Sequence, residues 1–236
     1  MVSLKMNKNS LKNIATEVID LEINALKILK KSINKNFDRA VNSIVDCQSK
    51  IILCGVGKSG LIAAKIASTF SSVGSPAFSL SANDCLHGDL GSITKKDVLI
   101  LISNSGKSEE IIPIIKFANR NKIKLIGIVS KKNSFLYKAS DIKILLPEVK
   151  ESGLGVVPTS STSIQLAIGD ALAVAALKKK QFSKYDFSRL HPGGNLGKQL
   201  KTVGDIMVTG KKIPLINENK NIDEALKIIS KKKLGV

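Results

Sequence analysis

Residues 100–111 read ILISNSGKSEEI, an apolar run that ends abruptly in small hydroxyl residues, a glycine and an acidic pair. This order predicts a strand, a tight turn and the N-terminus of a helix. Unpaired backbone N–H groups at a helix start attract anions, and serine hydroxyls add donors without bulk. We therefore expect Ser103, Ser105 and Ser108 to hold a phosphate. The residues leave one alternative open, a serine-rich loop in which Ser108 simply caps the helix.

Two further segments repeat this pattern. Residues 50–54 (KIILC) are a short apolar run that leads into GVGKSG at 55–60 and then into a helical pattern at 61–67. Residues 142–146 predict another strand, and PTSSTS at 158–163 opens the longest apolar helix. In an open parallel sheet such turns meet at the carboxyl edge, where ligands bind. Convergence of several hydroxyl-rich helix starts is a stronger signal for a ligand than any one of them.

The glycine-rich loop at 55–60 matches two better-known motifs only in part. Its glycines fit G-x-G-x-x-G, but the dinucleotide fingerprint needs an acidic residue at the end of the next strand, and the strand predicted near 77–80 ends without one. A P-loop would need its first glycine at Ile52. What remains is a glycine loop that lets a ligand approach the backbone, with Lys58 and Ser59 as donors.

Apolar periodicity predicts strands and helices in alternation along most of the chain. After one or two helices within 11–46, the predicted strands are 50–54, 76–80, 97–102, 124–129 and 142–146, and the predicted helices are 58–72, a short one before 94, 108–121, 133–139 and 159–180. Such alternation is typical of an α/β fold with a doubly wound parallel five-stranded sheet and helices on both faces.

Length and composition limit the class of protein. The 236 residues allow one domain of ordinary size and a small addition. Residues 1–13 are polar and lysine-rich, unlike a signal peptide. The most apolar stretch, 163–177, is too short to span a bilayer and contains Asp170. The cysteines have neither metal-ligand nor C-x-x-C spacing. We therefore expect a cytoplasmic protein.

A formal net charge of +18 is typical of proteins that bind nucleic acid, so this function has to be considered. However, arginine, the preferred residue for phosphate and base recognition, occurs only at positions 39, 120 and 189. The lysines are scattered and accompany many Ile and Asn residues. We interpret them as compositional bias and expect no nucleic-acid or membrane partner, although the positive field would attract a sugar phosphate.

Several motifs occur in a fixed order: GVGKSG at 55–60, HGDLG at 87–91, SNSG at 103–106, PTSST at 158–162 and HPGG at 191–194. Together they resemble the arabinose-5-phosphate isomerases, a family that joins a sugar isomerase (SIS) domain to a C-terminal pair of CBS motifs. The Ser-x-Ser-Gly loop alone marks the broader SIS class, whereas the two histidine motifs are specific to the isomerase. The resemblance runs from about residue 15 to the last residue.

The resemblance implies an SIS-type sheet and a division into three parts. Residues 1–47 would form N-terminal helices that pack on the SIS domain, and residues 48–200 would form the SIS domain, which binds the sugar phosphate. Residues 201–236 resemble the opening of a first CBS motif that then stops. Because roughly 35 residues cannot bury a core of their own, we expect this tail to be loosely packed or docked on the main domain.

The resemblance also implies a reaction, the interconversion of D-arabinose 5-phosphate and D-ribulose 5-phosphate through an enediol. The product would supply synthesis of Kdo, the eight-carbon acid sugar of outer-membrane lipopolysaccharide. Such a site must hold the phosphate, help to open the ring, and supply a base with donors for the enediolate oxygens. We expect no cofactor, because Lys and His can stabilise the oxyanion.

Catalytic roles follow from the resemblance for Lys58, Glu110, Glu151 and His191, each of which matches its motif position. From the residues alone, Glu109 fits the first turn of a helix as well as Glu110 does, and Glu151 could be an ordinary solvated charge. The resemblance assigns substrate contacts to a second group of residues: Ser59, Gly74, Ser75, His87, Ser103, Ser105, Ser108, Thr159, Ser160 and Ser161.

Two departures from the family pattern stand out. Lys107 replaces a glutamate that is not among the catalytic residues of the family. Ser81 replaces a histidine that often binds zinc in relatives, so we predict no metal site.

His191 lies beyond the last predicted sheet helix, and such segments commonly reach a neighbouring subunit in SIS proteins. The resemblance therefore implies a homotetramer with composite active sites. Two other functions remain open, a non-catalytic sugar-phosphate sensor and an isomerase of another phosphosugar.

Overall fold

The structure is a computed structural model that describes residues 11–191 and 203–233. The chain divides into two compact units at the boundary between Phe187 and Ser188.

The first unit is built on a five-stranded parallel sheet in the order β2-β1-β3-β4-β5. This confirms the predicted α/β fold with its parallel five-stranded sheet. The strands are β1 (Ile51–Gly55), β2 (Ala77–Ser81), β3 (Val98–Ile102), β4 (Lys124–Val129) and β5 (Ile142–Leu145), each within two residues of its predicted bounds. In register, Gly55 pairs with Ile102 and Ile102 pairs with Ile128, so the loops after β1, β3 and β4 leave the same edge.

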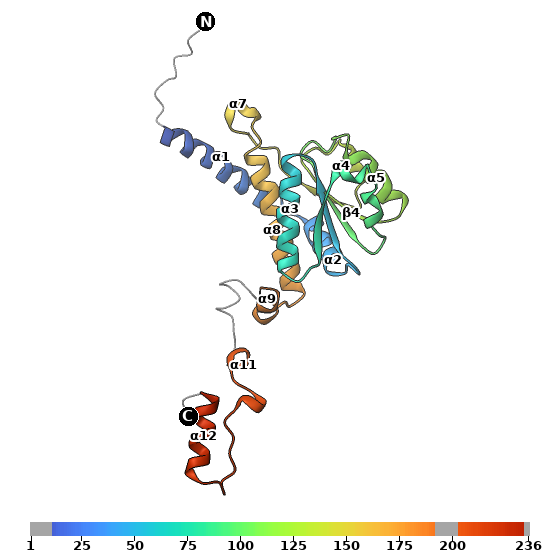
Figure 1. Cartoon of the computed structure of the whole chain (residues 1–236). Coiled ribbons are helices and arrows are strands. Elements are labelled where there is room, and N and C mark those ends of the chain that lie inside the picture. The colour runs from blue at the N-terminus through green and yellow to red at the C-terminus, as the bar shows by residue number, and fades with distance from the viewer. Residues whose placement is uncertain (1–10, 192–202, 234–236) are drawn as a thin grey trace. The chain divides into compact units, whose positions relative to one another are not determined.

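Helices cover both faces of the sheet (Figure 1). The helices of the first unit are α1 (Leu11–Ser32), α2 (Lys35–Val45), α3 (Lys58–Ser72), α4 (Ala82–Cys85), α5 (Ile111–Arg120), α6 (Phe135–Ala139), α7 (Gly153–Val156) and α8 (Ser160–Lys179), with the 3-10 turn η1 at Asp89–Ser92 and with α9 (Lys184–Leu190) crossing the boundary.

Strand β3 shows why the strand sequences are continuously apolar. Val98, Ile100 and Ile102 belong to one buried cluster, while Leu99 and Leu101 belong to the other. Successive side chains of a strand point to opposite faces, so a strand covered on both faces needs apolar residues at every position. The first cluster packs under α1, α2, α3 and α8, and the second under α4, α5 and α6.

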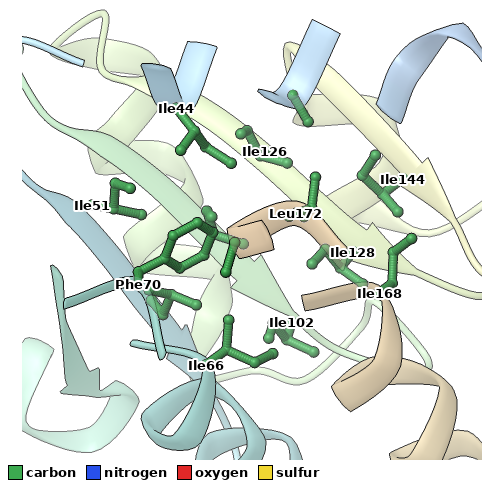
Figure 2. Packing of buried hydrophobic residues seen from close by; sticks show 14 of the residues in the cluster. Ile44, Ile51, Ile66, Phe70, Ile102, Ile126, Ile128, Ile144, Ile168 and Leu172 are labelled. Carbon is green, nitrogen blue, oxygen red and sulfur yellow. The ribbon is translucent and has the colours of Figure 1, made fainter. Parts of the chain in front are cut away.

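Helix α8 is the central helix of the first cluster. The sequence predicts an apolar stretch too short to span a bilayer, but the helix runs over 20 residues and is long and apolar enough to do so by length and composition alone. Its apolar face is nevertheless buried in the core: Ile164 is fully buried, and Ile168 and Leu172 pack in the same cluster (Figure 2). The 3.6-residue period brings these positions to one face. The helix therefore completes the core of the first unit.

The second unit contains α11 (Val203–Ile206), η2 (Gly210–Lys212) and α12 (Ile222–Lys232). None of its described residues from 203 to 233 is buried, and large apolar side chains such as Val203, Leu215 and Ile222 are exposed. Asn221 caps α12 by accepting a hydrogen bond from the backbone N–H of Glu224 at 3.0 Å. These residues form local structure without a core, and their assignment to a CBS motif remains a prediction.

Candidate functional site

The carboxyl edge of the sheet gathers the loop after β1, the loop after β3 and the start of α8. Ligands of open parallel sheets bind at this edge. Each of the three segments carries residues that the sequence predicts to be functional.

The loop after β1 is a tight turn into α3. A Cβ atom on Gly55 would lie 2.8 Å from the backbone of Ser59 and 2.9 Å from the backbone oxygen of Ile102, so only glycine allows this close approach. Lys58 is the first residue of α3 and is exposed to solvent. The Ser59 hydroxyl donates a hydrogen bond of 3.1 Å to Oε1 of Gln165 on α8.

The loop after β3 is held by its own serines. The Ser103 hydroxyl is buried, accepts from the backbone N–H of Gly106 at 3.0 Å and lies 3.4 Å from the Ser108 hydroxyl. Ser105 is exposed and accepts from the backbone N–H of Lys107 at 3.3 Å. Three hydroxyls therefore line one turn, as the phosphate hypothesis requires.

The start of α5 differs from the prediction. The sequence predicted a helix from residue 108 with Ser108 as a possible cap, but α5 begins at Ile111. The Ser108 hydroxyl faces Ser103, and a turn closed by the backbone bond from Ile111 N to Ser108 O precedes the helix. The turn forms in place of the first helical turn because the serine hydroxyls make local hydrogen bonds that compete with the helical backbone bonds.

Glu110 is the N-cap residue of α5, but its side chain makes no capping hydrogen bond. It is half-buried, whereas its neighbour Glu109 is exposed. Within the two described parts of the chain, no hydrogen bond or ion pair to the Glu110 carboxylate is found. A half-buried carboxylate without donors is free to accept a proton from a ligand.

Glu151 is held in a different way. Its Oε2 accepts from the backbone N–H of Thr159 at 2.8 Å, from the Thr159 hydroxyl at 3.2 Å and from the backbone N–H of Ser161 at 3.3 Å. Burial alone would raise the pKa of Glu151, but the hydrogen bonds from Ser161 and Thr159 outweigh it and leave the pKa below its ordinary value. Glu151 is therefore an ionised carboxylate that caps α8.

Two hydroxyls beside this cap lack partners. Ser152 and Ser160 are buried, and neither Oγ makes a hydrogen bond in the described structure. Ser160 is a predicted substrate contact, but Ser152 is not among the predicted residues. Glu151 and Ser152 also line a cavity of about 480 Å³, together with Ile14 and Val18 of α1. A buried hydroxyl without a partner is costly, so these groups suit a polar ligand.

His87 follows α4 and is exposed. Ser81 caps α4 by accepting from the backbone N–H of Asp84 at 3.3 Å. Among residues 11–191 and 203–233, no cluster of three or more His, Cys, Asp or Glu residues that could hold a metal is found.

Three of the predicted residues are not gathered with the others. Gly74 and Ser75 lie just before β2, with Pro76 between them and the strand, which puts them at the amino edge of the sheet. Ser75 is buried, and its hydroxyl accepts from Lys180 Nζ at 2.8 Å. His191 belongs to the second unit. The rest of its motif, residues 192–194, lies outside the described residues.

Gln165 is a polar residue of this region that the sequence motifs do not include. It is only 1% exposed and lies inside α8 among apolar residues. Buried amides require hydrogen-bond partners, so a glutamine in the middle of an apolar helix was the signal that could have identified it.

Comparison with known families matches residues 44–175 to the SIS domain. The arabinose 5-phosphate isomerase KdsD of Yersinia pestis is 43% identical over 222 residues, which cover 93% of this chain and 68% of that protein. An uncharacterised protein of Rickettsia prowazekii is 40% identical over 98% of this chain and 72% of its own length. Among solved structures, an Escherichia coli CFT073 protein in complex with arabinose 5-phosphate matches with a TM-score of 0.75 and 35% identity, over 79% of this chain and 100% of that one.

Proposed function

The chain belongs to the SIS-domain family and is a relative of the arabinose 5-phosphate isomerases, and on that premise we propose that it interconverts D-arabinose 5-phosphate and D-ribulose 5-phosphate. The observation that carries the proposal is the combination of a three-serine turn with two carboxylates of opposite character at one sheet edge. The turn suits a phosphate, and the unpaired carboxylate suits proton transfer. The relative solved in complex with arabinose 5-phosphate supports the choice of substrate.

We assign the phosphate to Ser103, Ser105 and Ser108, with the Thr159–Ser161 turn close by. The Ser59 hydroxyl donates its hydrogen to Gln165, so we assign Ser59 to a hydroxyl of the sugar and not to the phosphate. Hydroxyls and backbone N–H groups at helix starts stabilise anionic oxygens without bringing bulk. The Lys58 ammonium, at the start of α3, adds a mobile positive charge. His87 would contact the sugar.

The isomerisation moves one proton from C2 to C1. A base removes the C2 proton of the aldose, the C2 hydroxyl gives up its proton as the C2 carbonyl forms, O1 gains a proton, and C1 receives the transferred one. We assign the base to Glu110, because its carboxylate has no competing donor within the described residues. Glu151, for which the resemblance also implies a catalytic role, stays ionised and fixes the start of α8, and we propose that it serves the reaction by holding the Thr159–Ser161 turn in place. Lys58 and His191 would stabilise the enediolate oxygens.

The assembly is also part of the proposal. We propose a homotetramer with composite sites, in which Gly74, Ser75 and His191 serve the site of another subunit. The exposed apolar side chains of α1, including Leu11, Ile19 and Ile23, suit contacts between copies. Full activity of a monomer on sizing chromatography would contradict the composite site.

The remaining assignments follow the same relatives. We propose residues 1–47 as helices of the SIS unit, 48–200 as the sugar-phosphate domain and 201–236 as the start of a CBS motif. The protein would be cytoplasmic, would need no cofactor and would supply the lipopolysaccharide pathway. Its partners would be the sugar phosphate and its own copies.

The direct test incubates the chain with D-ribulose 5-phosphate in deuterated water with EDTA present and follows the products by NMR. We expect D-arabinose 5-phosphate that carries deuterium at C2, and loss of turnover in Glu110→Gln and His191→Ala. Exchange with a different phosphosugar only would reassign the substrate. Binding of phosphosugars without any turnover would indicate a sensor instead of an enzyme.

A further inference from the structure

Gln165 is a buried polar side chain inside the apolar helix α8. It is 1% exposed, and the neighbouring positions Ile164 and Ile168 belong to the core. Transfer of an amide from water to an apolar interior is unfavourable unless hydrogen bonds compensate for it. The side chain makes one hydrogen bond, in which Oε1 accepts from the Ser59 hydroxyl at 3.1 Å. Throughout residues 11–191 and 203–233, no partner is found for its amide nitrogen.

The bond between Gln165 and Ser59 connects two functional segments. Ser59 follows Lys58 at the start of α3, so the bond ties the proposed ammonium donor to α8. Ser161 lies four residues before Gln165 on the same face of α8 and binds the carboxylate of Glu151 through its backbone N–H at 3.3 Å. Two residues one turn apart on α8, Ser161 and Gln165, thus bind Glu151 and the residue next to Lys58.

The packing of α3 against α8 does not depend on this bond. The two helices approach closely at Gly169, where a Cβ atom would lie 2.2 Å from the Ile66 side chain. Lys65 and Asp170 form an ion pair of 2.5 Å between the same helices on the exposed side. Since apolar packing already joins the helices, the bond between Gln165 and Ser59 is not needed to hold them together.

The bond to Gln165 fixes the direction in which the Ser59 hydroxyl hydrogen points. A free serine hydroxyl rotates and can donate or accept. With its hydrogen directed to Gln165, Ser59 can only accept from further groups, so its oxygen is prepared for a hydroxyl or ammonium donor. An enediol site needs such defined acceptors, because misplaced groups lower the rate strongly.

We propose that Gln165 is a positioning residue for the isomerisation, which fixes the Ser59 hydroxyl as an acceptor and holds the Lys58 turn against α8. This inference rests on the proposed function, because it assigns a role within the same site. It predicts that loss of the acceptor at position 165 and loss of the hydroxyl at position 59 have the same consequence.

The experiment compares four variants of the full chain in the isomerase assay. Gln165→Met keeps the length and removes the acceptor, and Gln165→Glu keeps an acceptor oxygen and adds charge. Ser59→Ala removes the donor, and Asp170→Asn removes the ion pair between the same two helices as a control. For each variant, kcat and KM are measured separately, and circular dichroism checks the fold.

We expect Gln165→Met and Ser59→Ala to lower kcat by about 10- to 100-fold with KM nearly unchanged, and the double variant to be no worse than either single one. Gln165→Glu should keep kcat within about threefold of the native chain, because a carboxylate oxygen at position 165 can still accept the hydrogen of the Ser59 hydroxyl. Asp170→Asn should leave both constants within about twofold, as exposed ion pairs contribute little.

The proposal fails if Gln165→Met has native kcat, or if the effects of the two single variants multiply in the double variant. If Gln165→Met does not fold, the comparison of Gln165→Glu with Ser59→Ala decides, and equal losses of kcat would overturn it. If the native chain turns over no phosphosugar, the proposed function fails first. The positioning role within that isomerisation is then overturned together with it, whereas an active native chain with native kcat in Gln165→Met overturns the positioning role alone.

Discussion

Glu110 and Glu151 are both glutamates at the entrance of a helix on the same edge of the sheet, yet their surroundings are opposite. Glu151 accepts three hydrogen bonds from Thr159 and Ser161, and its pKa is lowered. Glu110 occupies the N-cap position of α5, but its side chain makes no hydrogen bond to the helix. The comparison shows that a carboxylate at a helix start either binds the backbone N–H groups of the helix or remains unbonded and available for proton transfer. Hydrogen-bond donors decide which of the two occurs.

The largest expected effect separates the two carboxylates by activity. Glu110→Gln keeps the shape of the side chain but removes the proposed base, so we expect kcat to fall by about 1,000-fold. The free energy of unfolding should change by less than about 0.5 kcal/mol, since no donor is lost. Steady-state kinetics and urea denaturation measure the two quantities.

Glu109→Gln is the matched control for that substitution, because Glu109 is the exposed neighbour. We expect native kinetics within about twofold, as for a surface substitution. If Glu109→Gln lost as much activity as Glu110→Gln, the assignment of the base would be wrong.

A second prediction tests how the loop that carries Glu110 is held. Gly106 has a φ of 64°, and a Cβ atom there would lie 2.3 Å from the Ser134 hydroxyl and 2.6 Å from a methyl group of Val129. Gly106→Ala therefore combines backbone strain with overpacking, and we expect a loss of about 3 kcal/mol in the free energy of unfolding. The midpoint of urea denaturation reports it.

Gly57→Ala separates these two causes. Gly57 has a similar φ of 57°, but no atom lies within 4 Å of the position that a Cβ atom would occupy there. Only strain remains, and because Gly57 combines this φ with a ψ of −126°, the loss should be about 2 kcal/mol. Equal losses in the two variants would show that packing around Gly106 does not hold the loop.

The third prediction removes the structural carboxylate. Glu151→Gln loses a charged helix cap, and we expect a loss of about 1 kcal/mol of stability at pH 7. Because the pKa of Glu151 is lower in the folded chain than its ordinary value of 4.5, the stabilisation is present above that value. It is lost as the pH falls through the folded pKa.

Urea denaturation at several pH values tests this linkage. The stability difference between the native chain and Glu151→Gln should be constant from about pH 6 to 8 and should shrink below about pH 4. A difference that grew in acid would mean that the pKa of Glu151 is raised in the folded chain, which would contradict the stabilising hydrogen bonds.

The sequence predicted the sheet better than the site, and particular residues explain why. Apolar runs such as 98–102 predict buried strands because both faces are covered, a property that depends on local composition. The roles of Glu151 and Gln165 depend on partners eight or more residues away, Thr159 and Ser59, which one sequence does not reveal. The start of α5 was wrong by three residues because serine hydroxyls in the turn compete with the helix.

The smallest expected effect concerns the unpartnered hydroxyl next to the Glu151 cap. Ser160 is fully buried, and its Oγ has no partner in the described structure. Ser160→Ala removes an unsatisfied polar group, so stability should stay within about 0.5 kcal/mol of the native chain or rise slightly. Affinity for D-ribulose 5-phosphate should nevertheless fall several-fold, because we propose that this hydroxyl contacts the ligand. Ser163→Ala, on the same helix and half-buried, should change neither quantity.

A loss of stability without a loss of affinity in Ser160→Ala would mean that this hydroxyl supports the cap at the start of α8. The contrast between a structural and an available carboxylate would then not extend to the serines around them.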